Sequence, residues 1–142
     1  MKFDTTIEEV MEDFEYLDDW EERYQEIIDL GKKLPPLEDC YKTEVYKVKG
    51  CVSQVWLVPH VTDSLPPIIT FDADSDAHIV RGLVTILMMA YSGKTAEQIL
   101  DVDINGIFDQ LDLKAHLSPS RSNGFLAMVK KIRSIASVAL AN

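Results

Sequence analysis

Apolar residues near the start of the chain recur at helical spacing, with acidic residues between them. They fall first at Ile7, Val10, Met11, Phe14 and Leu17, and then at Trp20, Tyr24, Ile27 and Ile28. This spacing predicts two amphipathic helices, or one helix with a break. Asp18 and Asp19 stand three residues before Glu21 and Glu22, which is the spacing of an N-capping arrangement. We therefore expect a restart near residue 19 and an end at Gly31, before two prolines.

Three short runs rich in β-branched and aromatic residues follow these prolines. They span residues 42–49 (KTEVYKVK), 53–61 (SQVWLVPHV) and 68–71 (IITF), and their closeness along the chain predicts antiparallel pairing. Gly50 and Cys51 lie between the first two runs, where a hairpin needs a residue that tolerates positive φ. Glycine has that freedom. The pattern therefore places Cys51 on a turn.

Residues 79–90 are apolar on all sides, which is typical of a buried helix. We expect this segment to be the central core element and to lie on the small sheet. Asp74, Ser75 or Asp76 can cap its start, and Ser92 with Gly93 can end it.

The last third of the chain reads as further helices. Thr95 can cap a short helix through Leu100, another turn or two follows near residues 107–111, and Ser118 or Ser120 can cap a final amphipathic helix to about Leu140. The expected fold class is α+β: a small three-stranded antiparallel sheet packed against several helices, including the buried central helix.

Length and composition are those of an ordinary globular protein. The chain has 142 residues, 46% of them hydrophobic, and we expect a single domain over residues 1–142. The acidic N-terminal stretch leaves no room for a signal sequence, and the apolar run at 82–91 is too short to cross a bilayer. Two cysteines, Cys40 and Cys51, form no CxxC pair, so reduced thiols in the cytoplasm are expected.

The charge is unevenly distributed. The net charge is −10, and residues 1–30 hold 12 acidic residues against only Lys2 and Arg23. A chain this acidic, without a basic stripe, is a poor candidate for nucleic acid, whose phosphates demand clustered cations. The acidic segment fits a solvated helix face, and a docking patch is the alternative.

Metal and phosphate sites find no support in the spacing. His60, His78 and His116 stand far apart and form none of the pairs that zinc sites use. Neither a GxGxxG nor a GxxxxGK[ST] loop occurs. Asp72 and the two aspartates that follow at alternate positions lack the glycine and glutamate of a calcium loop, so capping explains them better.

Cys51 is the strongest candidate for chemistry. A cysteine is commonly a small buried core residue, but this one follows Gly50 in a predicted turn, where an exposed thiol is expected. The neighbouring Lys47 and Lys49 should favour the thiolate, the nucleophilic form of cysteine. We interpret Cys40 as structural or incidental.

With these residues in view, VKGCVSQVWL resembles the active-site segment of the SufE family of sulfur-acceptor proteins. Three more blocks of the chain are similar to that family: DWEERYQEIIDLGKKLPPL, DSDAHIVRGLVTILMMAYSGKTAEQI and LDLKAHLSPSRSNGF. Together they cover most of the chain. Tyr46 and Val52 depart from the family pattern, in which an asparagine or another polar residue and a glutamine are common; such changes bear on loop packing or partner preference.

The resemblance implies a sulfur carrier. Cys51 would take persulfide sulfur from a cysteine desulfurase, stimulate that enzyme, and pass the sulfur to an iron-sulfur cluster assembly scaffold by thiol-disulfide exchange. The chain itself would need no cofactor, because the pyridoxal phosphate belongs to the desulfurase. On this interpretation the protein is an accessory protein rather than an enzyme.

The resemblance also suggests supporting residues. Arg121 would contact the partner, although it can equally be a plain first-turn helix residue, and Asp74 would lie in a loop near the cysteine or only cap a helix. Gln54 and Trp56 would support the loop. Two alternatives remain: an independent thiol enzyme, with Cys51 as nucleophile and His60 or His116 as base, and a cluster scaffold, which would require several converging thiolates.

Overall fold

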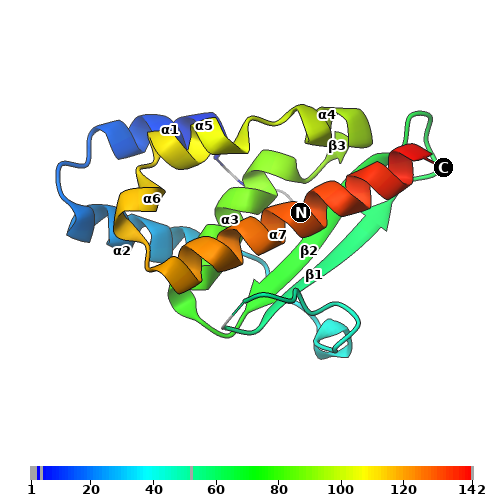
Figure 1. The fold of residues 1–142 in the computed structure, drawn as a ribbon, viewed down its shortest axis with the longest axis horizontal. Helices are drawn as coiled ribbons and strands as arrows, with labels where there is room; N and C mark the ends of the chain where they lie inside the picture. The colour runs from blue at the N-terminus through cyan, green and yellow to red at the C-terminus, as the bar shows by residue number, and fades with distance from the viewer. Residues whose placement is uncertain (1–2, 4, 52, 142) are drawn as a thin grey trace.

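The computed structural model describes residues 3, 5–51 and 53–141 of the chain. Its elements are, in chain order, α1 (Ile7–Glu15), α2 (Trp20–Gly31), the 3₁₀ turn η1 (Asp39–Tyr41), β1 (Val55–Val61), β2 (Ile68–Ser75), α3 (His78–Tyr91), β3 (Lys94–Thr95), α4 (Ala96–Asp101), α5 (Ile104–Gln110), α6 (Leu113–His116) and α7 (Pro119–Ala141). Figure 1 shows a small sheet with helices packed on it, so the predicted α+β class is confirmed. Within the described ranges, no helix combines the length and the apolar character that a membrane span requires.

The sheet has three antiparallel strands in the order β1-β2-β3, but they are not all the predicted ones. β1 and β2 pair from Val55 with Ser75 to Val61 with Ile69, and the third strand is the short β3 rather than residues 42–49. The prediction of a strand at 42–49 is wrong. Residues 44–46 form a turn instead. The antiparallel pairing of this segment with β1 is limited to a bridge between Lys47 and Trp56.

Residues of β1 and of the segment before it form a small separate cluster. Leu37, Trp56 and Val58 are buried together, with Tyr41 and Tyr46 packed against them. The rings of Tyr41 and Tyr46 meet edge to face, with centroids 5.6 Å apart. Of the apolar residues that suggested a strand, Tyr46 packs against this cluster, Val48 is buried in the main core and Val45 is exposed.

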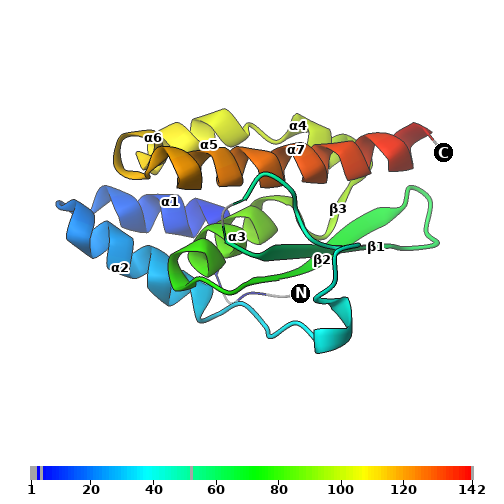
Figure 2. The same cartoon turned by 60° about the horizontal axis from the view of Figure 1, so that its bottom comes forward.

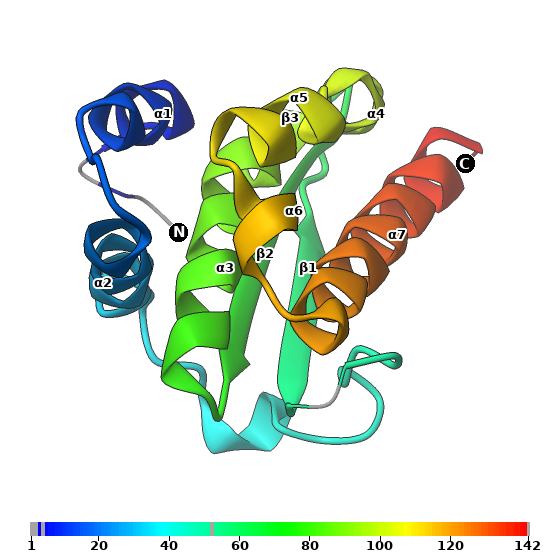
Figure 3. The same cartoon turned by 60° about the vertical axis from the view of Figure 1, so that its left-hand side comes forward.

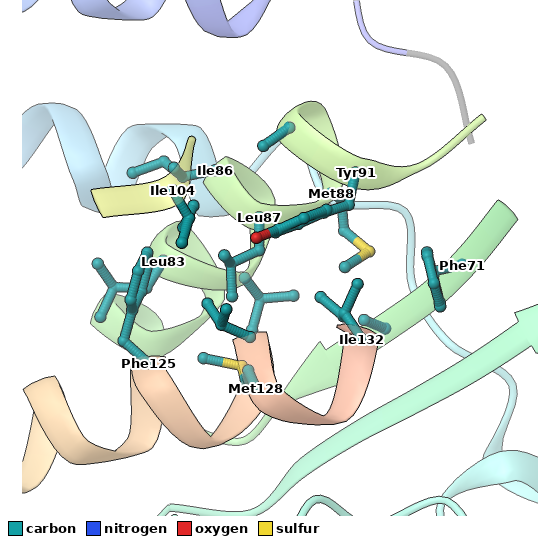
Figure 4. Packing of buried hydrophobic residues seen from close by; sticks show 14 of the residues in the cluster. Phe71, Leu83, Ile86, Leu87, Met88, Tyr91, Ile104, Phe125, Met128 and Ile132 are labelled. Carbon is teal, nitrogen blue, oxygen red and sulfur yellow. The ribbon is translucent and has the colours of Figure 1, made fainter. Parts of the chain in front are cut away.

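Helix α3 is the buried centre of the fold, as predicted. It lies between α2 and α7 (Figure 3), and its contacts with α2 are close enough to require glycine. A Cβ atom on Gly82 would lie 1.9 Å from the carbonyl oxygen of Ile27, and one on Gly31 would lie 2.8 Å from the backbone nitrogen of Gly82. Figure 4 shows Leu83 and Leu87 of α3 meeting side chains of α7 in the core.

Several of the predicted helix caps are confirmed. Asp19 accepts a hydrogen bond from Glu22 N at the start of α2 and Thr95 forms a capping box with Gln98 at α4. Ser118 Oγ accepts from the backbone nitrogen of Arg121 in the first turn of α7. The predicted side-chain cap of α3 is wrong, because β2 runs on to Ser75 and α3 begins after Ala77 without a capping side chain.

Candidate functional site

The loop of residues 49–54 joins the bridge at Lys47 to β1 and lies against α7. Its base is closed by a hydrogen bond from Val48 N to Val55 O of 2.8 Å. In Figure 2 the chain rises from η1 to the side of α7 before it enters β1. Gly50 has φ of 93°, which confirms the prediction, and a Cβ there would lie 3.2 Å from Cβ of Ala127. Positive φ and the nearness of α7 both favour glycine at this position.

The thiol of Cys51 is sheltered by α7. Its side chain is half-buried, and Sγ donates a weak hydrogen bond to the carbonyl oxygen of Gly124 at 3.6 Å. Gly124 has no side chain, so the loop rests directly on the helix backbone. The predicted exposure of Cys51 is therefore wrong, although its predicted place in a loop between Lys47 and β1 is confirmed.

Burial raises the pKa of the Cys51 thiol above its ordinary value. This is opposite to the effect expected from Lys47 and Lys49. Lys47 Nζ lies 3.7 Å from Glu44 Oε1, so an acidic neighbour offsets its charge, and Lys49 is exposed to solvent. In this arrangement Cys51 is held as a neutral thiol.

A pocket of about 410 Å³ opens beside Cys51, between the loop, α3 and α7. Its lining comprises Cys51, Ser53, Val80, Leu83, Ser118, Ser120, Arg121, Gly124, Phe125 and Met128. The apolar members come from α3 and α7, and the polar members from the loop and the start of α7. The thiol thus borders a space that is lined by both apolar and polar side chains.

Arg121, for which the resemblance implied contact with a partner, lines this pocket. It is exposed in the first turn of α7, and its Nη1 donates a hydrogen bond to the hydroxyl oxygen of Tyr24 in α2 at 3.3 Å. Cys51 and Arg121 are the two pocket residues that the sequence analysis proposed as site residues.

Asp74 takes a different place from the one expected. It is buried at the end of β2, where it pairs with Arg81 of α3 and lies 3.7 Å from Lys42 Nζ. Arg81 also donates to the carbonyl oxygens of Gly31 and Leu34. Asp74 is not among the described residues that line the pocket, so it joins α2, β2 and α3 instead of touching the thiol.

Asp76 is the aspartate that holds the loop. Its carboxylate accepts a hydrogen bond from Gln54 N at 3.1 Å, and its own backbone nitrogen donates to Gln54 O at 3.2 Å. Gln54 is therefore fixed through its backbone rather than its side chain. Sequence spacing gave no sign of this pairing, because Asp76 looked like a helix cap.

Trp56 and Tyr46 lie behind the loop, in the cluster with Leu37 and Val58. Lys42 Nζ is 5.7 Å from the centroid of the Trp56 ring, within the range of a cation–π contact. The ring of Tyr46 packs against this cluster, beside the segment that leads to Cys51. Val52 lies outside the described residues.

Neither candidate base is placed beside Cys51. His60 Nε2 lies 2.9 Å from Asp72 Oδ2, and His116 Nε2 lies 3.1 Å from Asp112 Oδ2. His116 also stacks on Trp20, with centroids 4.2 Å apart. Neither histidine belongs to the described lining of the pocket. The arrangement offers a thiol without a hydrogen-bonded general base.

The remaining metal-ligand and thiol candidates are scattered. Across the part of the chain that the structure describes, no group of three or more His, Cys, Asp or Glu residues is placed to hold a metal ion. Cys40 is exposed on η1, with Sγ 3.7 Å from Glu38 Oε2. The other pocket residues were not predicted as site residues; among them, the apolar faces of the central and last helices were the signal for Val80, Leu83, Phe125 and Met128.

Comparisons with known proteins identify the family to which the sequence is similar. A family model described as "SufE: Fe-S metabolism associated domain" matches residues 8–136. An uncharacterized SufE-like protein of Rhizobium meliloti (strain 1021) is 47% identical over 133 residues, which cover 93% of this chain and 95% of that protein. Another, of Rhizobium etli, is 50% identical over 137 residues, covering 96% and 93%.

A solved structure is similar in fold. The solution structure of a hypothetical protein from Thermus thermophilus matches with a TM-score of 0.74 over 96% of each chain, at 20% sequence identity. At that identity the match concerns the fold alone.

Proposed function

The chain belongs to the SufE family, and on that premise we propose that Cys51 accepts sulfur from a cysteine desulfurase and hands it to an iron-sulfur assembly scaffold. The family is associated with iron-sulfur metabolism. The observation that carries the proposal is the position of Cys51: one thiol on a loop, beside a pocket, held by a weak contact with Gly124.

The transfer step moves one sulfur atom without a net oxidant. The Cys51 thiolate attacks the outer sulfur of the desulfurase persulfide, a new S–S bond forms on Cys51, and the old S–S bond breaks. The desulfurase cysteine leaves as a thiolate, and the proton that Cys51 lost passes to it or to solvent. The same exchange, repeated with a thiol of the scaffold, delivers the sulfur.

Stimulation of the desulfurase follows from this exchange. A desulfurase that carries its own persulfide cannot complete another cycle until that sulfur is removed. An acceptor thiol clears it and so raises the turnover. No cofactor is assigned to this chain, because the pyridoxal phosphate that releases sulfur from cysteine belongs to the partner.

The resting loop must yield before Cys51 can react. The neutral thiol has to leave the carbonyl of Gly124 and lose its proton, because the thiolate is the attacking species. Loops can move while the elements that carry them stay fixed. The pocket offers room for the added sulfur between transfers, which would limit its oxidation by solvent species.

The surrounding residues have supporting roles in this proposal. Arg121 contacts a carboxylate of the desulfurase from the rim of the pocket, since a guanidinium can pair with a carboxylate through two hydrogen bonds. Gln54 holds one end of the loop, Trp56 supports the segment behind it, and Asp74 fixes the elements underneath.

A turnover assay tests the proposal with a matched pair of variants. Cysteine desulfurase activity is measured with cysteine as substrate, with and without the parent chain, Cys51→Ser or Cys40→Ser. The parent chain and Cys40→Ser should both stimulate turnover, because Cys40 is remote from the pocket lining. Cys51→Ser should give none of that stimulation. Stimulation by Cys51→Ser equal to that of the parent chain would show that the transfer mechanism is wrong.

A further inference from the structure

Arg121 has no carboxylate partner within the described part of the chain, a feature that it shares with Arg133 but not with Arg23 or Arg81. Arg81 pairs with Asp74, and Arg23 lies 3.8 Å from Asp112 while donating to two backbone carbonyls. Arg133 donates to the carbonyl of Leu100. Arg121 instead donates to the hydroxyl of Tyr24. In a chain with 24 acidic residues and 14 basic ones, an arginine held only by a neutral phenol keeps its charge available.

The contact between Tyr24 and Arg121 crosses from α2 to α7. A second contact joins α2 to α6, the helix that precedes α7, because Trp20, one turn before Tyr24 on α2, stacks on His116. The backbone of Arg121 is also fixed by its hydrogen bond to Ser118 Oγ at 3.3 Å. The hydroxyl of Tyr24 thus reaches a guanidinium whose own helix turn is already anchored.

We propose that Tyr24 is a positioning residue that holds the Arg121 guanidinium at the rim of the Cys51 pocket without neutralising it. This inference rests on the proposed function, in which Arg121 meets a carboxylate of the desulfurase. A phenol oxygen accepts one of the five N–H donors of the guanidinium and leaves the others for a planar anion. Holding the side chain in place lowers the conformational entropy that binding would otherwise lose.

The variant that isolates this role is Tyr24→Phe, which keeps the ring and removes only the hydroxyl. The chain is titrated into a cysteine desulfurase that the parent chain stimulates, and the half-saturating concentration and the maximal rate are measured separately. Tyr24→Phe should raise the half-saturating concentration about three- to tenfold, the range expected for one hydrogen bond, and leave the maximal rate unchanged. Tyr16→Phe is the matched control, since Tyr16 is 82% exposed and should behave as the parent chain.

A double-mutant cycle separates positioning from packing. If Tyr24 acts through Arg121, Tyr24→Phe has no further effect in an Arg121→Ala background. Equal effects of Tyr24→Phe in both backgrounds, or no effect in the parent background, would overturn the inference. A loss of maximal rate together with a lower thermal unfolding midpoint would also overturn it, because that result describes a structural role.

Failure of the inference and failure of the proposed function are distinguishable in the same samples. Intact mass, measured without reductant, reports whether the parent chain takes up sulfur from the desulfurase. Sulfur uptake without coupling between Tyr24 and Arg121 overturns the positioning role alone. Absence of sulfur uptake by the parent chain overturns the proposed function and, with it, the inference.

Discussion

Glycine lies at the contact between α2 and α3 and also at the contact between the Cys51 loop and α7, but the space around the glycine differs greatly between the two. A Cβ on Gly82 would fall 1.9 Å from a backbone oxygen, which no real side chain tolerates. A Cβ on Gly124 would lie 3.5 Å from Cys51 Sγ, an ordinary contact. The backbones of α2 and α3 therefore approach each other more closely than Cys51 approaches the backbone of α7.

The two regions also differ in what holds them. The α2–α3 region is fixed by Arg81, which binds Asp74 and two carbonyls, and by side chains packed in the main core. The loop is held by the hydrogen bond between Val48 and Val55 at its base, by the Asp76–Gln54 pair and by one weak sulfur contact. The elements beneath the thiol are therefore held by stronger contacts than the loop that carries the thiol.

The largest expected effect comes from closing the tight contact. Gly82→Ala should lower the free energy of unfolding by at least about 3 kcal/mol, because the new methyl group meets backbone of Ile27. Gly124→Ala should stay within about 1 kcal/mol of the parent chain, since alanine favours helix and its Cβ fits. Denaturant unfolding of both variants measures the difference. Equal losses at the two glycines would break the comparison.

Removing Arg81, the ionic partner of Asp74, should have the next largest effect on the free energy of unfolding. Arg81→Met leaves the buried carboxylate of Asp74 with Lys42 at 3.7 Å, and should cost about 2–3 kcal/mol. Lys32→Met is the control, because the Lys32–Asp29 pair is exposed and its loss should barely move the unfolding midpoint. A thermal or denaturant melt distinguishes them, and a tolerated Arg81→Met would contradict the fixed role given to this region.

The pH dependence of Cys51 alkylation sharpens the description of the lightly held region. Burial raises the folded-state pKa of the thiol, so at neutral pH it carries less thiolate than in the unfolded chain. The alkylation rate should rise about tenfold per pH unit and level off at a higher pH when the chain is folded than when it is denatured. The measurement uses Cys40→Ser, so that one thiol reports.

The sign of this shift also fixes its effect on stability. A pKa raised by folding favours the folded state below the unfolded pKa, and that contribution is lost as pH rises through the folded pKa. An inflection for the folded chain at or below that of the denatured chain would contradict the sheltered position of Cys51.

The smallest expected effect comes from a substitution that releases the Cys51 loop at Gln54. Asp76→Ala removes the acceptor for Gln54 N and should speed the alkylation of Cys51 about threefold, with little change in stability. Asp63→Ala, in an exposed loop elsewhere, should leave the rate as in the parent chain. Equal rates for all three chains would mean that the Asp76–Gln54 pair does not restrain the loop.

The sequence predicts best what depends on neighbours along the chain. The break before Asp19, the Thr95 cap and positive φ at Gly50 are local requirements, and each was found where expected. The buried α3 was readable because apolar residues surround it. No hydrophobic pattern predicts β3. Its two residues, Lys94 and Thr95, pair with β2 because the chain returns to the edge of the sheet after α3.

The site depends on contacts that spacing does not encode. Cys51 is sheltered by Gly124, 73 residues away, so its half-buried state could not be inferred from its turn. Asp74 has the position of a helix cap in the sequence, but in the structure it is buried near the end of β2 and pairs with Arg81. In the segment 42–49, Tyr46 packs in the cluster with Trp56 and Val48 enters the main core, and neither contact could be inferred from the alternation of the segment.

The central claim is that Cys51 alone carries the transferred sulfur, and peptide mapping tests it most directly. The parent chain is incubated with a cysteine desulfurase and cysteine without reductant, trapped with an alkylating agent, and digested, and the mass of each cysteine-containing peptide is measured. The account predicts one added sulfur atom on the peptide of Cys51 and none on that of Cys40. Sulfur on the Cys40 peptide, or on neither peptide, would contradict it.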